Sequence, residues 1–80
     1  MSVATVRLNG LFSSDSIINN TYPVLFREKK IKLRVALSKM TLHIPEKSVA
    51  FFAINGVKAV KDSWVVDGDI IDIFPVVTGG

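Results

Sequence analysis

The chain has 80 residues, of which 49% are hydrophobic, and it carries a formal net charge of +3. This length makes one domain with a small core, and the hydrophobic content argues against a disordered chain. The sequence contains no cysteine, which excludes a disulfide framework, a thiolate metal site and a cysteine nucleophile, so any sulfur chemistry must use sulfur brought from outside. The single histidine, His43, argues against a zinc site made by protein ligands alone.

Charge is unevenly distributed along the sequence. Residues 27–47 hold seven basic side chains and two glutamates, whereas residues 62–72 hold four aspartates and no base. We therefore expect a molecule with a basic side and an acidic side. No apolar run approaches the length that spans a bilayer, and the N-terminus lacks the basic region and long hydrophobic stretch of a signal peptide. The simplest expectation is a cytoplasmic protein.

The first predicted elements are two strands that form a hairpin. Residues 3–12 place apolar or small side chains at the even positions, which is the period of two of a half-buried strand. Turn-forming residues cluster in residues 13–21 and predict a connection. Residues 22–27 alternate again, and Pro23 suits a strand at the edge of a sheet.

Residues 31–42 carry two conflicting patterns. Ile31, Leu33, Val35 and Leu37 alternate as in a strand, while part of the same segment keeps helical spacing. The later half is rich in good helix formers, and the strand pattern fails at Ala36, Ser38 and Met40. We therefore predict a helix within residues 31–42, although no Ser, Thr, Asp or Asn caps its start. Residues 43–46 are predicted to end it, because the residue before a proline avoids the helical region.

The C-terminal half is predicted to be a set of strands. Val49–Ile54 is a continuous apolar run too short for a helix, and Asn55-Gly56 after it is a strong hairpin signal that turns residues 57–60 back beside it. Residues 67–69 have turn chemistry, and residues 70–74 are β-branched and aromatic, which predicts a strand buried on at least one face. Pro75 is predicted to end the ladder, so residues 75–80 form a flexible tail.

This order of elements predicts the fold. The predicted order is strand, strand, helix, strand, short strand, strand. This is the order of an α+β domain with the β-grasp, or ubiquitin-like, fold over residues 1–80. One helix would pack across a mixed sheet of four to five strands. The last strand would lie centrally, beside the first, and would hold the base of the tail rigid.

The last two residues, Gly79-Gly80, are the candidate reactive element. Glycine has no Cβ and reaches φ values closed to other residues, so an arm that ends in two glycines can thread a narrow channel and present its carboxylate to an enzyme. The alternative is a frayed end, where small residues are tolerated. Disordered ends tend to be polar or charged, whereas this segment stays hydrophobic up to Thr78.

Three segments carry a resemblance to a known family. They are Asn55-Gly56, Asp67-Gly68-Asp69 and the ending from Ile73 to Gly80, and together they resemble the ubiquitin-like sulfur carriers of the ThiS and MoaD family, which serve thiamine and molybdopterin synthesis. The specific match covers roughly the last third of the chain. The Phe-Pro-x-Val-Thr-Gly-Gly ending is more similar to the molybdopterin member, while residues 53–55 and 62–64 are more similar to the thiamine member.

The resemblance implies a function and a set of partners. An E1-like adenylyltransferase of the ThiF or MoeB type would adenylate Gly80 with ATP, and a thiocarboxylate would form there. A synthase of the MoaE or ThiG type would accept the sulfur, for a molybdopterin or related metal-pterin cofactor slightly in preference to the thiamine thiazole. The chain would be a protein co-substrate, able to serve as the small subunit of a synthase complex, with no bound cofactor, metal, nucleic acid or membrane. The remaining expected partner contacts are Phe74, Pro75, Val76, Val77, Thr78 and Gly79.

Two other functional classes stay open. A ubiquitin-like protein modifier or interaction module would share the fold but end in an isopeptide bond. A small basic nucleic-acid-binding β domain is suggested by charge alone, since the basic stretch lacks interleaved aromatic residues. We expect Trp64 to pack inside the domain rather than to anchor a partner. Asp67 and Asp69 are interpreted as turn residues, and Asp72 as an outward position of the last strand, rather than as a cation site.

Overall fold

The structure is a computed structural model, and it describes residues 1–9, 21–40 and 44–76. Within these residues no helix is long and apolar enough to cross a membrane. The elements in chain order are β1 (Ser2–Leu8), β2 (Thr21–Phe26), β3 (Lys30–Lys32), α1 (Leu33–Ser38), the 3-10 helix η2 (Glu46–Ser48), β4 (Val49–Ile54), β5 (Val57–Ala59), β6 (Trp64–Val66) and β7 (Ile70–Pro75).

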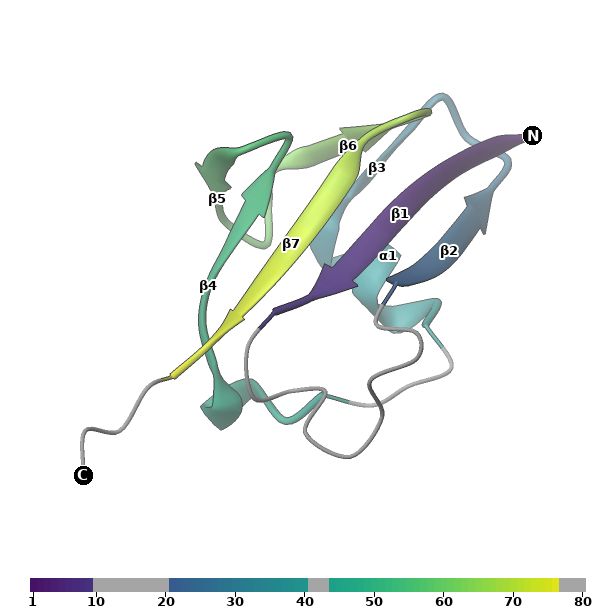
Figure 1. The fold of residues 1–80 in the computed structure, drawn as a ribbon. Coiled ribbons are helices and arrows are strands. Elements are labelled where there is room, and N and C mark those ends of the chain that lie inside the picture. Colours follow the sequence, from purple (N-terminus) through teal and green to yellow (C-terminus); the bar gives the residue numbers. More distant parts are fainter. Residues whose placement is uncertain (10–20, 41–43, 77–80) are drawn as a thin grey trace.

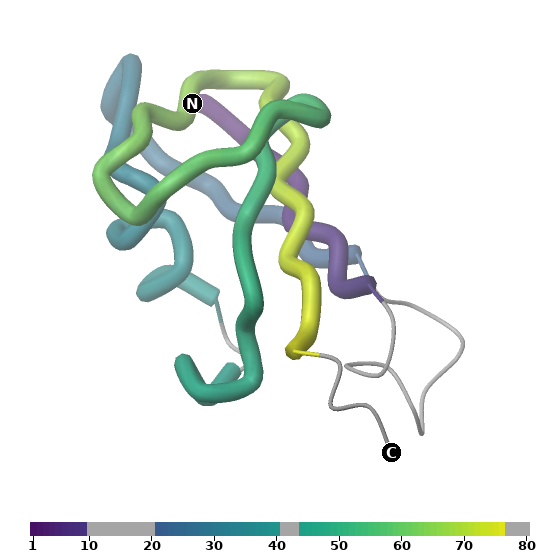
Figure 2. The backbone as a smooth tube through the Cα atoms, turned by 90° about the vertical axis from the view of Figure 1, so that its left-hand side faces the viewer, coloured from purple at the N-terminus to yellow at the C-terminus, as the bar shows by residue number. Residues whose placement is uncertain are grey.

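The main sheet has five strands in the order β2-β1-β7-β4-β5. Strands β1 and β7 are parallel, and the other neighbours in this sheet are antiparallel. A separate ribbon pairs β3 with β6, and α1 lies behind the main sheet (Figures 1 and 2). This arrangement confirms the predicted β-grasp fold, with the last strand central and beside the first.

The core lies between α1 and one face of the sheet. The even positions of β1 (Ala4, Val6 and Leu8) are buried, as the alternation predicted, and those of β2 follow the same rule with Val24 and Phe26. Pro23 lies on β2, an edge strand of the sheet. Proline has no backbone N–H to donate, and an edge strand tolerates this because it has a neighbouring strand on one side only. Residues 10–12 of the first predicted strand lie outside the described residues. The remaining buried members of this core are Ile31, Leu33, Ala36, Val65, Ile71 and Ile73.

The ambiguous segment turns out to be a strand followed by a helix. Residues 30–32 pair with β6, and the helix then runs only from Leu33 to Ser38. Two carbonyls of the β5–β6 connection replace the missing side-chain cap: the backbone N–H of Leu33 donates to the Ser63 oxygen at 2.8 Å, and that of Arg34 donates to the Lys61 oxygen at 3.0 Å. The predicted helix is confirmed within its bounds, and the short strand before it was missed.

The hairpin signal at Asn55-Gly56 is confirmed. Asn55 has φ 51° and Gly56 has φ 83°, the positive pair that two-residue hairpin turns require. The turn joins β4 to β5, and β4 keeps the predicted bounds.

The end of β7 differs in one respect from the prediction. The strand stops at Pro75 as expected, but the backbone N–H of Val76 still donates to the Ser48 oxygen at 2.9 Å. The register between β4 and β7 shifts between Val49 and Phe51. The regular pairing of the two strands is already interrupted at such an irregularity, so a proline, which has no backbone N–H to donate, is tolerated there. Pro75 and Val76, which were expected in the tail, are therefore held at the sheet.

Candidate functional site

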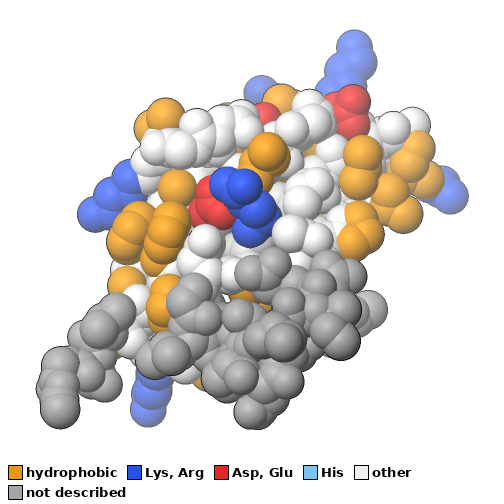
Figure 3. Space-filling model, viewed as in Figure 1, with side chains coloured by type: hydrophobic (Ala, Val, Ile, Leu, Met, Phe, Trp, Pro, Cys, Tyr) orange, Lys and Arg blue, Asp and Glu red, His pale blue; other side chains and the backbone are white. Residues whose placement is uncertain are grey.

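One face of the main sheet is turned away from α1, and we call it the open face (Figures 1 and 3). The strand registers place the odd positions of β1 on this face, together with alternate positions of β7 and β4. Its members are Val3, Thr5 and Arg7 of β1, Pro23 and Leu25 of β2, Phe51 and Ala53 of β4, Lys58 of β5, and Ile70, Asp72 and Phe74 of β7.

Two stacked aromatic rings lie where β7 leads into the tail. The ring centroids of Phe51 and Phe74 are 4.5 Å apart, and the ring planes are inclined by 16°. Phe51 is 39% exposed even though β4 is an interior strand, and Lys58 Nζ lies 5.8 Å from the centroid of the Phe51 ring. Aromatic residues exposed in this way contribute strongly to protein interfaces. The continuous apolar run of β4 is explained by this face, because alternate residues serve the core and the open face.

The base of the predicted tail is fixed by hydrogen bonds on both sides. On the β1 side, the backbone N–H of Asn9 donates to the Ile73 oxygen at 3.1 Å, and its side-chain amide donates to the same oxygen at 3.2 Å. On the β4 side, Val76 is bonded to Ser48. The predicted site residues Phe74, Pro75 and Val76 therefore lie together at one end of the sheet, whereas residues 77–80, including both glycines, lie outside the described residues.

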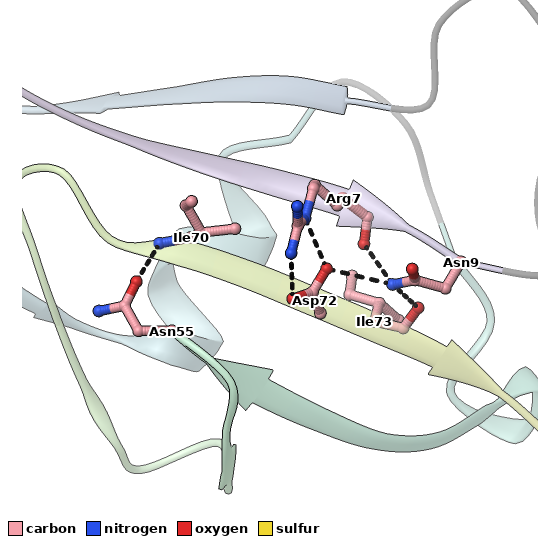
Figure 4. A network of polar contacts seen from close by, with 6 residues as sticks. All are labelled: Arg7, Asn9, Asn55, Ile70, Asp72 and Ile73. Atoms are coloured by element: carbon pink, nitrogen blue, oxygen red, sulfur yellow. Dashed lines mark hydrogen bonds and ion pairs between the residues drawn. The ribbon is translucent and has the colours of Figure 1, made fainter.

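Asp72 takes the outward position on β7 that the sequence predicted, but it is shielded from solvent. The residue does lie on the open face, but only 6% of it is exposed, because Arg7 covers it from the neighbouring strand. Nε and Nη2 of Arg7 donate to the two oxygens of Asp72 at 2.8 and 2.9 Å, and the amide of Asn9 donates to Oδ1 at 3.3 Å (Figure 4). The hydrogen bond from Arg7 holds the pKa of Asp72 below its usual range, against the opposing effect of burial, and the same pair raises the pKa of Arg7.

Asp69 and Asn55 tie the start of β7 to the neighbouring turns. Asp69 is buried, and it accepts from the Val66 backbone N–H and from the Asn55 amide, each at 2.8 Å. The amide oxygen of Asn55 accepts from the Ile70 backbone N–H at 2.9 Å (Figure 4). Asp67 accepts from the Val3 backbone N–H at 2.8 Å. Both aspartates serve turns, as predicted, and within the described residues no cluster of His, Asp and Glu is placed to hold a metal ion.

Trp64 was predicted to pack inside the domain, and this prediction was wrong. The residue is 50% exposed, and Nζ of Lys30 and of Lys32 lie 4.3 and 4.9 Å from its ring centroid. The β3–β6 ribbon turns Ile31 and Val65 into the core, so the alternating side chains, including Trp64, face outward. The basic stretch thus has an aromatic neighbour after all, supplied by a segment about 30 residues later in the sequence, which linear inspection could not reveal.

The comparisons with known proteins support the fold rather than a particular reaction. No protein-family model matches the sequence, and no curated protein matches it. Among solved structures, the chain is similar to "Putative molybdopterin converting factor, subunit 1" from Pyrococcus furiosus, with 17% identity and a TM-score of 0.65 over 96% of this chain and 100% of that one. The sequence resemblance to sulfur carriers covers roughly the last third of the chain, whereas the similarity of fold to this solved structure covers nearly all of it. This protein has the β-grasp fold that is found in that converting factor subunit.

Proposed function

We propose that the protein is a sulfur carrier whose reactive group is the α-carboxylate of Gly80. The observation that carries the proposal is the position of β7: the strand that precedes the Val-Val-Thr-Gly-Gly segment is paired on both sides, and it ends beside the stacked rings of Phe51, which is exposed, and Phe74, which is half-buried. A rigid strand end beside an apolar surface suits a chain whose terminus is offered to another enzyme's active site. The likeness of fold and the resemblance of residues 73–80 point the same way.

The chemistry requires activation because a carboxylate is a poor electrophile. A carboxylate oxygen of Gly80 attacks the α-phosphorus of ATP, pyrophosphate leaves, and an acyl-adenylate forms. The terminal sulfur of a persulfide on another protein then attacks the carbonyl carbon and expels AMP, and a thiol cleaves the resulting S–S bond to leave the thiocarboxylate. Sulfur must come from outside because this chain has no cysteine. The protein's own contribution is placement, so we regard it as a co-substrate rather than as an enzyme.

The partners follow from this chemistry. The first is an E1-like adenylyltransferase of the ThiF or MoeB type, which would bind the tail as an extended segment and contact Phe74, Pro75 and Val76 at its base. Main-chain hydrogen bonds would give affinity, and alternate side chains would give specificity. The second is a synthase of the MoaE or ThiG type that accepts the sulfur. We place the acceptor on the molybdopterin side on the strength of the Phe-Pro-x-Val-Thr-Gly-Gly ending, and rescue of a thiamine requirement alone in carrier-deficient strains would reverse that placement.

The direct test is the intact mass of the C-terminal peptide. The full chain is incubated with the cognate E1-like enzyme, ATP and a sulfur donor, and the same mixture without ATP is the control. We expect a mass gain equal to one sulfur atom replacing one oxygen atom at Gly80. Stable conjugates to lysines of other proteins, with no thiocarboxylate at Gly80, would refute the proposal in favour of a protein modifier.

Two variants separate the reactive end from the folded domain. Deletion of Gly80 should abolish the mass gain. Gly80→Ala should suppress adenylation, because a Cβ beside the reacting carbonyl disturbs the near-attack geometry, while the melting temperature stays at the wild-type value. Adenylation of Gly80→Ala at the wild-type rate would contradict the steric part of the argument.

A further inference from the structure

The middle of the open face is a charged pair within an apolar surround. Figure 3 shows basic and acidic atoms together there, with hydrophobic side chains on both sides. The pair is Arg7 and Asp72, which lie opposite each other on the parallel strands β1 and β7. Its neighbours on the same face include the exposed side chains of Val3, Ile70 and Phe51. A partner that covers the apolar residues must therefore also cover this pair.

The two members of the pair are not equally available to a partner. The side chain of Asp72 is only 8% exposed, and its oxygens already accept three hydrogen bonds, two from Arg7 and one from Asn9. The side chain of Arg7 is 50% exposed. A guanidinium has five N–H donors, and the described residues take two of those of Arg7, both through Asp72. At the centre of the open face, Arg7 therefore presents donors that the described residues leave unused, whereas the oxygens of Asp72 are already occupied.

The fork of hydrogen bonds also fixes the orientation of Arg7 before any partner arrives. A side chain that is already immobilised loses little rotamer entropy on binding. Covering its free N–H groups without an acceptor would leave them unsatisfied in an interface, which is unfavourable. Lys58 adds a second positive charge to the same face. A partner surface that carries a carboxylate among apolar residues would suit both the unused N–H donors of Arg7 and the positive charge of Lys58.

We propose that Arg7, oriented by Asp72, is a specificity-determining contact that selects an adenylating partner with a carboxylate facing the centre of the open face. This inference rests on the proposed function, because it takes the E1-like enzyme as the protein that holds the tail and covers the face. Asp72 acts as a positioning residue, and Arg7 makes the contact. A partner with a neutral or basic surface at this point is rejected.

The test uses the double variant R7Q/D72N, which removes both charges but keeps side chains that can hydrogen-bond to each other. The matched control is R34Q/D62N, because Arg34 and Asp62 form the same kind of pair, at 2.6 Å, elsewhere on the molecule. The dissociation constant of each full chain with the cognate E1-like adenylyltransferase is measured by calorimetry, and KM and kcat by ATP–pyrophosphate exchange. Far-UV circular dichroism and thermal melts establish that each variant is folded.

We expect R7Q/D72N to bind roughly ten-fold or more weakly than wild type, as is usual for loss of a close charge pair across an interface. The KM of R7Q/D72N should rise and its kcat should stay unchanged. The control R34Q/D62N should match wild type in both. The variant R7E/D72N tests the sign of the partner's charge and should bind more weakly still. Wild-type affinity in R7Q/D72N, or tighter binding by R7E/D72N than by R7Q/D72N, would overturn the inference.

Two further readouts keep the outcomes distinct. Wild-type affinity should fall as salt rises from 0.05 to 0.5 M, roughly as expected for a charge contact that ions screen, and an unchanged affinity would overturn the inference even if the variants fail to fold. If the wild-type chain is adenylated but the R7Q/D72N chain is adenylated equally well, the specificity contact fails and the carrier function stands. If the wild-type chain is neither bound nor adenylated, the carrier function fails and the contact fails with it.

Discussion

Replacing Asn55 tests whether the turn before β5 holds the start of β7. The side chain of Asn55 donates to the buried Asp69 at 2.8 Å and accepts from the Ile70 backbone N–H at 2.9 Å, while its own backbone has φ 51°. Asn55→Ala removes both side-chain hydrogen bonds, worth about 1 kcal/mol each. It also forces a residue with a Cβ into the left-handed region, which costs about 1 kcal/mol more. The free energy of unfolding should therefore fall by about 3 kcal/mol.

Asn55→Gly separates these contributions. Glycine accepts a positive φ without strain but makes no side-chain hydrogen bond, so its loss should be nearer about 2 kcal/mol. For a domain of this size each kcal/mol shifts the melting temperature by roughly 4–8 °C, so the two variants should differ measurably. Urea denaturation followed by far-UV circular dichroism gives the free energies. An Asn55→Ala protein within about 0.5 kcal/mol of wild type, or one less destabilised than Asn55→Gly, would refute this account of the turn.

Four further predictions follow from other parts of the molecule. Phe74→Ala should raise the KM for the proposed E1-like enzyme by roughly ten-fold or more, as expected for an interface anchor, and should lower the melting temperature because the half-buried ring stacks on Phe51; an unchanged KM in the folded variant would remove Phe74 from the interface. Because Arg7 holds the pKa of Asp72 low, the pair stabilises the fold above the unfolded pKa of about 3.9, and that contribution is lost as pH falls through the lower folded pKa. The urea midpoint between pH 5 and 2 should therefore fall more steeply for wild type than for Asp72→Asn, and parallel profiles would contradict the pairing. Leu33→Ala should destabilise the domain by about 2–5 kcal/mol in urea denaturation, because Leu33 is fully buried, and a loss below that range would show that the site collapses around the smaller residue. Fluorescence of Trp64 should be quenched more strongly by iodide than by caesium, since two lysines lie within 5 Å of its ring, and equal quenching would show that those contacts do not persist in solution.

The elements that the sequence predicted correctly depend on local chemistry. Alternation in residues 3–12 and 22–27 identified the first two strands, which the structure has at Ser2–Leu8 and Thr21–Phe26, because a half-buried strand imposes a period of two on its own residues. Asn55-Gly56 identified the hairpin because both residues must adopt positive φ. The order of these elements then led to the β-grasp fold, and the C-terminal segments led to the resemblance with sulfur carriers. These signals lie within a few residues of one another in the chain.

Tertiary structure decided the features that depend on distant residues. Residues 31–42 carried both a strand pattern and a helix pattern. The pairing of Ile31 with Val65, together with the carbonyl caps from the β5–β6 connection, set the boundary between strand and helix. Asp72 is covered because the parallel pairing of β1 and β7 brings Arg7 beside it from 65 positions away. Trp64 is exposed because Val65, its neighbour, takes the place in the core. A side chain's burial depends on which strand lies next to it, and that neighbour is chosen by the whole fold rather than by the residues on either side in sequence.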